Sequence, residues 1–345
     1  MGHPYRIREI AVQAGLSERT VDRVLNSRSG VRASTAREVQ QAIADLDRQR
    51  SQLRLGGRTF IVDVVMQAPE RFSSAVRDAL EAELPSLRPA AIRCRFHFRE
   101  TCPPEELVAT LDRIRTRGSQ AVILKAPDLP EITAACSRLI RAGIPVVTLV
   151  TDLPGSQRLA YIGMDNRAAG ATAAYLMGQW LADQPGNILV TLSRDFFRGE
   201  EEREMGFRSA MRSRYPNRHL IEIDNSDGLD ESMRGLVLAA LETDPNIDAV
   251  YSIGGGNMAI VEAFASTGRT YSVFVAHDLD HDNTRLLRTG RISAVLHHDL
   301  NQDMRRACHA IMQAHKALPG AAHPWPSNIH VITPYNMPIP ALYEP

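Results

Sequence analysis

The sequence RIREIAVQAGLSERTVDRVLN, residues 6–26, has the pattern of two short helices joined by a tight turn. Ile7 and Ile10 fall on one face of the first helix, at the spacing of an apolar stripe. Gly15 follows, a residue type that readily adopts the left-handed conformation that closes a helix. Ser17 is a good N-cap for the next helix. The stretch therefore predicts a helix–turn–helix.

The second helix of this stretch offers polar side chains at its exposed start. Such a helix suits the major groove of DNA, where Arg favours guanine and Glu accepts from cytosine. Glu18, Arg19 and Arg23 are the expected base readers, and four residues are expected to contact phosphate: Arg8, Thr20, Arg28 and Arg32. The alternative is a generic helical hairpin at the surface. The full set of candidate DNA-contacting residues is Arg8, Ser17, Glu18, Arg19, Thr20, Arg23, Asn26, Arg28, Arg32 and Leu53.

Charge is distributed unevenly along a chain whose formal net charge is zero. Residues 1–58 hold eleven Arg, no Lys and six acidic residues, a net charge of +5 that the remainder must balance with −5. A small basic segment on a mildly acidic body is the asymmetry expected of a nucleic-acid binder with a separate partner site.

Bulk composition is that of an ordinary globular protein. The chain is 44% hydrophobic and 23% charged. Its length of 345 residues is enough for two or three domains. The four Cys residues lie far apart without a C-x-x-C pair, so we expect a reducing compartment and no metal site. The start lacks an apolar run and no stretch is long enough to span a membrane, so we expect a cytoplasmic protein.

From Phe60 onward the pattern alternates between apolar β-branched runs and helical segments. Uninterrupted runs such as FIVDVVMQ (60–67) and AVILKA (121–126) suit strands buried on both faces of a parallel sheet. We therefore predict an α/β fold with two Rossmann-like lobes behind an all-α headpiece. The expected domains are 1–56, headpiece and linker, and 57–345, with one lobe at about 60–162 and 292–320 and the other at about 163–291 and 325–345.

Polar residues follow the strands where ligands of open parallel sheets bind. Carboxylates and amides accept from hydroxyl groups, Arg donates to them, and an aromatic ring covers an apolar sugar face. The pattern favours a sugar or polyol held between the lobes, with strand-end caps or salt bridges as the alternative for each single residue. The candidate ligand-binding residues are Gln67, Arg71, Phe72, Lys125, Thr151, Asp152, Asp165, Arg203, Asn257, Asp278, His297 and His298.

The chain resembles the LacI/GalR family of bacterial transcription regulators. The resemblance rests on IREIAVQAGLSERTVDRVLN, on VRASTAREVQQAIADL, and on later pieces that include YIGMDNRAAGATAAYLM (161–177), GGGNMAIVEAF (254–264) and VFVAHD (273–278). It implies a homodimer that binds a palindromic operator and responds to a small molecule in its C-terminal domain. By the same resemblance Arg203, Asn257 and Asp278 match ligand-contacting positions.

Two segments depart from the family pattern. His297 or His298 stands where relatives usually carry Gln. Relatives also have a Pro-containing linker followed by a short helix that inserts an apolar wedge into the minor groove. Here the linker is LDRQRSQLRL (46–55), without Pro, and Leu53 or Leu55 would have to act as the wedge.

Other functions fit the sequence less well. Gly254–Gly256 lacks the G-x-G-x-x-G and Lys-Ser/Thr patterns of nucleotide sites, Ser193 lacks a G-x-S-x-G context, and the His residues match no metal signature. We therefore expect no cofactor and no catalysis. A solute-binding protein of a transport system and an α/β enzyme with a regulatory headpiece are the alternatives to a ligand-controlled repressor.

Overall fold

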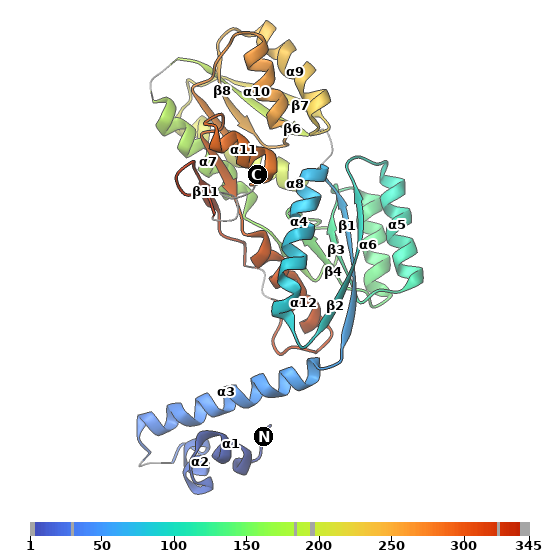
Figure 1. The fold of residues 1–345 in the computed structure, drawn as a ribbon, viewed down its shortest axis with the longest axis vertical. Helices are drawn as coiled ribbons and strands as arrows, with labels where there is room; N and C mark the ends of the chain where they lie inside the picture. The colour runs from blue at the N-terminus through green and yellow to red at the C-terminus, as the bar shows by residue number, and fades with distance from the viewer. Residues whose placement is uncertain (1–3, 29–30, 183–184, 194–196, 323–324, 339–345) are drawn as a thin grey trace.

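The computed structural model describes residues 4–28, 31–182, 185–193, 197–322 and 325–338. They form a small helical headpiece and two α/β lobes stacked end to end, with the headpiece set apart beyond the first lobe (Figure 1). The predicted fold class is confirmed.

The headpiece contains α1 (Ile7–Ala14), α2 (Glu18–Leu25) and α3 (Ala33–Leu55). Gly15 ends α1 in the left-handed conformation at φ 66°, and the Ser17 side chain accepts from the backbone of Thr20 at the start of α2. A core of five buried side chains joins the three helices: Ile10, Ala11, Val21, Val39 and Ala42. The expected linker is not separate, since α3 continues through it to Leu55.

The first lobe is built on a five-stranded parallel sheet in the order β2-β1-β3-β4-β5. Its central strands are buried throughout, because helices cover both faces. α4 and α12 pack on one face and α5 and α6 on the other. The elements are β1 (Thr59–Gln67), α4 (Glu70–Glu83), η1 (Leu84–Leu87), β2 (Ala91–Arg99), α5 (Pro104–Arg117), β3 (Ala121–Lys125), α6 (Pro130–Arg141), β4 (Val146–Leu149), β5 (Ala160–Ile162) and α12 (Leu300–Ala314).

The second lobe has a six-stranded sheet in the order β11-β10-β9-β8-β6-β7, with only β11 antiparallel to its neighbour. α7 and α8 pack on one face of this sheet, and α9, α10 and α11 on the other. The elements are α7 (Asn166–Leu181), β6 (Asn187–Ser193), α8 (Arg198–Arg214), β7 (Leu220–Ser226), α9 (Asp230–Thr243), β8 (Ile247–Ser252), α10 (Asn257–Ser266), β9 (Val273–His277), α11 (His281–Arg288), β10 (Ala294–His297) and β11 (His330–Ile332).

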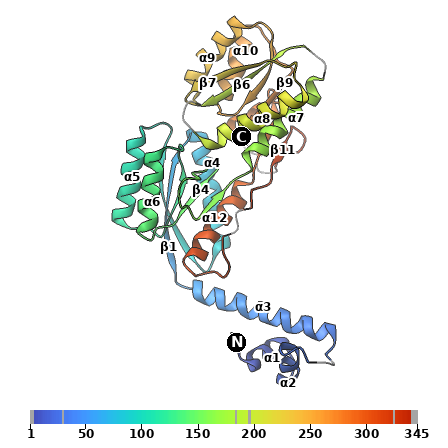
Figure 2. The ribbon, with the colours of Figure 1, turned by 180° about the vertical axis from the view of Figure 1, so that it is seen from behind.

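One predicted boundary is wrong. Residues 292–320 were expected in the first lobe, but β10 pairs in parallel with β9 of the second sheet, and only α12 returns to the first lobe. The chain therefore crosses from the second lobe back to the first between His297 and Leu300. The strand pattern does not show which sheet a strand joins, because both sheets bury their strands on two faces. The view from behind shows α12 back in the first lobe, near β4 (Figure 2).

Among the described residues, no helix has the length and apolar character needed to cross a membrane.

Candidate functional site

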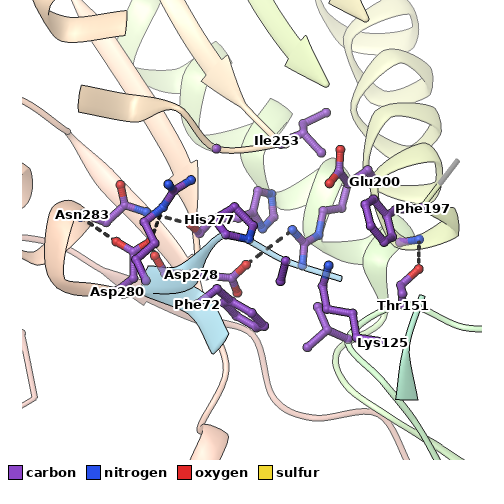
Figure 3. A pocket seen from close by; sticks show the side chains of 18 of the residues that line it. Phe72, Lys125, Thr151, Phe197, Glu200, Ile253, His277, Asp278, Asp280 and Asn283 are labelled. Atoms are coloured by element: carbon purple, nitrogen blue, oxygen red, sulfur yellow. Dashed lines mark hydrogen bonds and ion pairs between the residues drawn. The ribbon is translucent and has the colours of Figure 1, made fainter. Parts of the chain in front are cut away.

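A cavity lies where the carboxyl ends of the two sheets face each other. It contains about 620 Å³ of empty space, counting its opening to solvent. Both lobes contribute walls (Figure 3). The lining residues are Ala68, Pro69, Arg71, Phe72, Lys125, Val150, Thr151, Phe197, Gly199, Glu200, Arg203, Ile253, Gly254, Gly255, Asn257, His277, Asp278, Asp280 and Asn283.

The aromatic part of the cavity surrounds a lysine. Lys125, at the end of β3, donates through Nζ to the backbone oxygen of Gln67 at 3.1 Å. The same Nζ lies 4.0 Å from the ring centroid of Phe197 and 5.9 Å from that of Phe72. A cation this close to an aromatic ring is attracted to its face. The site therefore offers aromatic rings beside a donor.

The opposite wall carries Arg203 and Asp278, both from the second lobe. Arg203 on α8 is buried, and its Nε donates to Asn166 Oδ1 at 2.8 Å. Its Nη1 lies 3.8 Å from Asp278 Oδ2, just beyond β9. Asp278 has a φ of 63°, a conformation uncommon for a residue other than Gly. The turn thus places the carboxylate beside the arginine on the same wall of the cavity.

Buried polar atoms without hydrogen-bond partners gather at this wall. Among the described residues they include Arg203 Nη2, Asn257 Oδ1, His277 Nδ1 and Asp278 Oδ1, all from lining residues, and the adjacent His298 Nε2. Leaving such an atom unpaired costs about 1–3 kcal/mol, so their concentration at one place indicates a site for a polar ligand.

The charges of the lining are balanced. Three basic side chains, Arg71, Lys125 and Arg203, face three carboxyl groups, Glu200, Asp278 and Asp280. Burial raises the pKa of Asp280 to about 6 and also raises the pKa of Glu200. Both shifts follow from the burial of these two carboxyl groups, and the balance of charges favours a neutral ligand over an ion.

Arg71 connects the two lobes at the rim of the cavity. It starts from α4 in the first lobe, and its Nε lies 3.0 Å from Asp280 Oδ2 in the second. Its Nη2 donates to the Gly228 carbonyl at 3.2 Å, and a Cβ on Gly255 would come within 2.5 Å of the same Nη2. Loops from three strands of the second lobe thus form a socket that receives one side chain of the first.

The exposed face of the headpiece carries the candidate DNA-contacting residues. Arg8, Glu18 and Arg19 are exposed. Two of these candidates, Asn26 and Arg28, contact the carboxylate of Asp22. Asp22 forms an ion pair with Arg28 at 3.3 Å and accepts a hydrogen bond from the Asn26 side chain at 2.8 Å. Of the rest, Ser17, Asn26, Arg28 and Arg32 are exposed and Thr20 and Arg23 are half-buried, whereas the side chain of Leu53 lies outside the described residues.

Comparisons with protein families match both parts of the chain. A model described as bacterial regulatory proteins, lacI family, matches residues 6–50, and one described as a periplasmic binding protein domain matches residues 64–318. This chain belongs to the lacI family of bacterial regulatory proteins. Its helix–turn–helix and two-lobed domain are those of a DNA-binding regulator that responds to a small molecule. No curated protein matches it.

Solved structures resemble this lacI-family regulator in fold. A structure described as a LacI transcriptional regulator from Bacteroides fragilis has 16% identity and a TM-score of 0.70, covering 81% of this chain and 98% of that one. GanP, a glucose-galactose binding protein from Geobacillus stearothermophilus, has 18% identity and a TM-score of 0.72, covering 82% and 100%. A solute-binding protein from Burkholderia graminis in complex with D-arabinose has 19% identity and a TM-score of 0.70, covering 81% and 96%.

Five of the twelve sequence-derived ligand candidates lie outside the lining of the regulator's cavity. Asp165 caps α7 by accepting from Ala168, and Asp152 pairs with Arg158. The backbone oxygen of Gln67 accepts a hydrogen bond from Lys125. His297 and His298, expected from the first lobe, end the second sheet instead, with His297 Nδ1 accepting from the backbone of Leu279.

His298 lies immediately behind the cavity wall. It is fully buried, with Nδ1 2.5 Å from Asp303 Oδ2 and Nε2 3.6 Å from Asp278 Oδ1. It therefore supports Asp278 rather than lining the cavity.

Several lining residues were not among the sequence-derived candidates. Glu200 lies one turn before Arg203 on α8, and its carboxylate accepts from Ser193 at 2.8 and 2.9 Å. Asp280 and Asn283 follow Asp278 at the start of α11, where Asp280 caps the helix. Asp280 and Asn283 lie about one helical turn beyond the residues read directly after β9. Glu200 precedes the candidate Arg203 on α8, and no sequence signal set it apart from the other acidic residues at the start of that helix.

Proposed function

We propose that this lacI-family regulator is a sequence-specific operator-binding repressor controlled by a neutral sugar or polyol bound between its lobes. The observation that carries the proposal is the set of unpaired buried polar atoms at Arg203, Asn257 and Asp278, opposite the ring of Phe72. Hydroxyl groups both donate and accept, so a polyhydroxylated ligand suits a wall that offers both donors and acceptors. GanP is described as a glucose-galactose binding protein, and the Burkholderia graminis protein is in complex with D-arabinose. These sugars support the proposed ligand class.

Seven sequence-derived candidates are proposed as effector contacts, namely Arg71, Phe72, Lys125, Thr151, Arg203, Asn257 and Asp278. The headpiece is proposed to read bases through Glu18, Arg19 and Arg23. We further propose that the protein acts in the cytoplasm as a homodimer, because one headpiece reads only half of a palindrome. The effector is bound without being converted.

A screen of sugars and polyols by thermal shift tests the effector class. A ligand at 100 times its dissociation constant adds about 2.7 kcal/mol of stability, so a true effector should raise the melting temperature by several degrees. The ligand should then change operator affinity in fluorescence anisotropy and be recovered unchanged. Conversion of the ligand would favour the enzyme, and a stabilising ligand without effect on DNA binding would favour the solute-binding alternative.

A further inference from the structure

Three segments of the chain cross between the two lobes. The first, residues 163–165, joins β5 to α7, the second, residues 298–299, joins β10 to α12, and the third returns from α12 to β11. The first and third lie side by side, because Ser327 forms a parallel bridge with Met164 and donates its backbone N–H to the Gly163 oxygen at 2.8 Å. Movement of one lobe against the other must bend these three segments.

A buried carboxylate on α12 contacts two of the crossing segments. Asp303 Oδ1 accepts from the Ser327 hydroxyl of the third segment at 2.5 Å, and Arg306 Nη1 lies 3.5 Å from the same oxygen. Asp303 Oδ2 lies 2.5 Å from Nδ1 of His298 in the second segment. An ionised carboxylate only accepts hydrogen bonds, so Nδ1 of this histidine carries a proton. Asp303 therefore fixes the orientation of the His298 ring.

The other nitrogen of the His298 ring points to the wall of the cavity. Nε2 lies 3.6 Å from Oδ1 of Asp278, and both atoms are buried without a hydrogen-bond partner. An approach of about half an ångström would bring them to hydrogen-bonding distance. A proton on Nε2 then gives both atoms a partner, which removes the cost of burying them unpaired. The second oxygen of Asp278, Oδ2, faces Arg203 in the cavity.

We propose that Asp303 and His298 are positioning residues for the effector site, in which Asp303 orients His298 and His298 donates through Nε2 to the carboxylate of Asp278. This inference rests on the proposed binding of an effector between the lobes. The three side chains form a continuous buried connection from the cavity wall to the segments that bend when the lobes move. An effector bound to Asp278 therefore acts on these segments through side chains as well as by touching both lobes.

Magnetic resonance of the full-length protein with isotope-labelled histidine tests the connection without an effector. Both ring nitrogens of His298, assigned from the signals that His298→Gln removes, should carry protons at neutral pH in the wild type. Asp303→Asn should shift the Nδ1 signal, and Asp278→Asn should shift the Nε2 signal. An Nε2 without a proton, or one that is insensitive to Asp278→Asn, would overturn the proposal.

Hydrogen exchange tests whether Asp303 holds the crossing segments together. The backbone amide of Ser327 should exchange severalfold faster in Asp303→Asn than in the wild type, because the Ser327 hydroxyl loses its charged acceptor. Asp63→Asn is the matched control, since Asp63 is an equally buried carboxylate that pairs with Arg95 and does not line the cavity. Equal exchange at Ser327 in the two variants would show a general loss of stability and overturn the role of Asp303.

A double-mutant cycle on sugar affinity tests the order of the connection. Glucose, galactose and D-arabinose serve as probes in calorimetric titration. Asp303→Asn should weaken binding of the sugar by about tenfold, the effect of losing one charge-assisted hydrogen bond, whereas Asp63→Asn should not change it. In a His298→Gln background, Asp303→Asn should have no further effect.

The possible outcomes of the cycle separate this proposal from the effector class on which it rests. Additive losses in the double variant would show that Asp303 does not act through His298, which overturns the proposal. Binding of none of the three sugars to the wild type would count against the proposed effector class instead. The resonance and exchange measurements, which need no effector, would then decide whether Asp303 and His298 position Asp278.

Discussion

Asp278 is the residue on which effector binding should depend most clearly. It faces Arg203 at 3.8 Å, and His298 backs it at 3.6 Å. Asp278→Ala should weaken effector binding by ten- to hundredfold, because a charge-assisted hydrogen bond contributes roughly 1.5–3 kcal/mol. DNA binding should persist, since the operator surface lies in the headpiece. Calorimetric titration with the screened sugar checks this, and the exposed Asp224→Ala is the matched control. Unchanged affinity would place the site elsewhere.

His297 should make folding stability depend on pH. Burial lowers its pKa to about 4, and the Leu279 amide donates to its Nδ1, which must then stay unprotonated. The unfolded chain takes up this proton near pH 6.5, so stability is lost as pH falls from about 6.5 to about 4, by about 1.4 kcal/mol per pH unit. Urea denaturation of His297→Gln should show a flatter pH profile than the wild type over that range. Parallel profiles would contradict the assignment.

Two helices of the second lobe approach so closely that a glycine is required between them. A Cβ on Gly170 of α7 would lie 1.9 Å from the backbone oxygen of Arg203 on α8. Gly170→Ala should therefore destabilise the protein by several kcal/mol and displace Arg203 from the cavity. Gly235 of α9 has no atom within 4 Å of a built Cβ, so Gly235→Ala should stabilise by roughly 0.5–1 kcal/mol. Denaturant unfolding of both variants measures the contrast, and equal effects would contradict it.

Elements with local signals were predictable from the sequence. Gly15 and Ser17 marked the turn of the headpiece, and the buried runs of Val and Ile marked the strands. The partner of β10 was not predictable, because a strand buried on two faces fits either sheet. The continuity of α3 was missed because the resemblance suggested a separate linker, although residues 46–55 contain no helix breaker. Local propensity was the better guide there.

The residues of the cavity also divide into those that a local sequence pattern indicates and those that only folding brings together. Residues at strand ends, such as Lys125 and Asp278, were found because parallel strands place their carboxyl ends together. Asp165 and Asp152 satisfied the same rule but serve as a helix cap and an ion-pair partner. The contact of Arg71 with Gly228 joins residues 157 positions apart, and no sequence pattern encodes it. Sequence therefore located the cavity, while packing decided which residues line it.

At the scale of the whole molecule, Arg71 should hold the two lobes closed. Its socket of Gly228, Gly255 and Asp280 belongs to the second lobe, and both members of the Arg71–Asp280 pair are largely shielded from water. Arg71→Ala removes this contact and leaves the Asp280 carboxyl buried without its cation, which favours the open arrangement. Effector affinity should fall tenfold or more, mainly through faster dissociation.

The latch role of Arg71 can be separated from direct contact with the effector by measuring closure without effector. Energy transfer between one dye on each lobe should report a longer mean separation in effector-free Arg71→Ala than in the wild type, while the exposed Arg234→Ala should match the wild type. A residue that merely touches the effector would leave the effector-free distance unchanged. Because a ligand shifts a conformational equilibrium only by its differential affinity, weakening the latch should also change the effect of the sugar on operator affinity. An unaltered distance together with slow effector release would show that closure does not depend on Arg71.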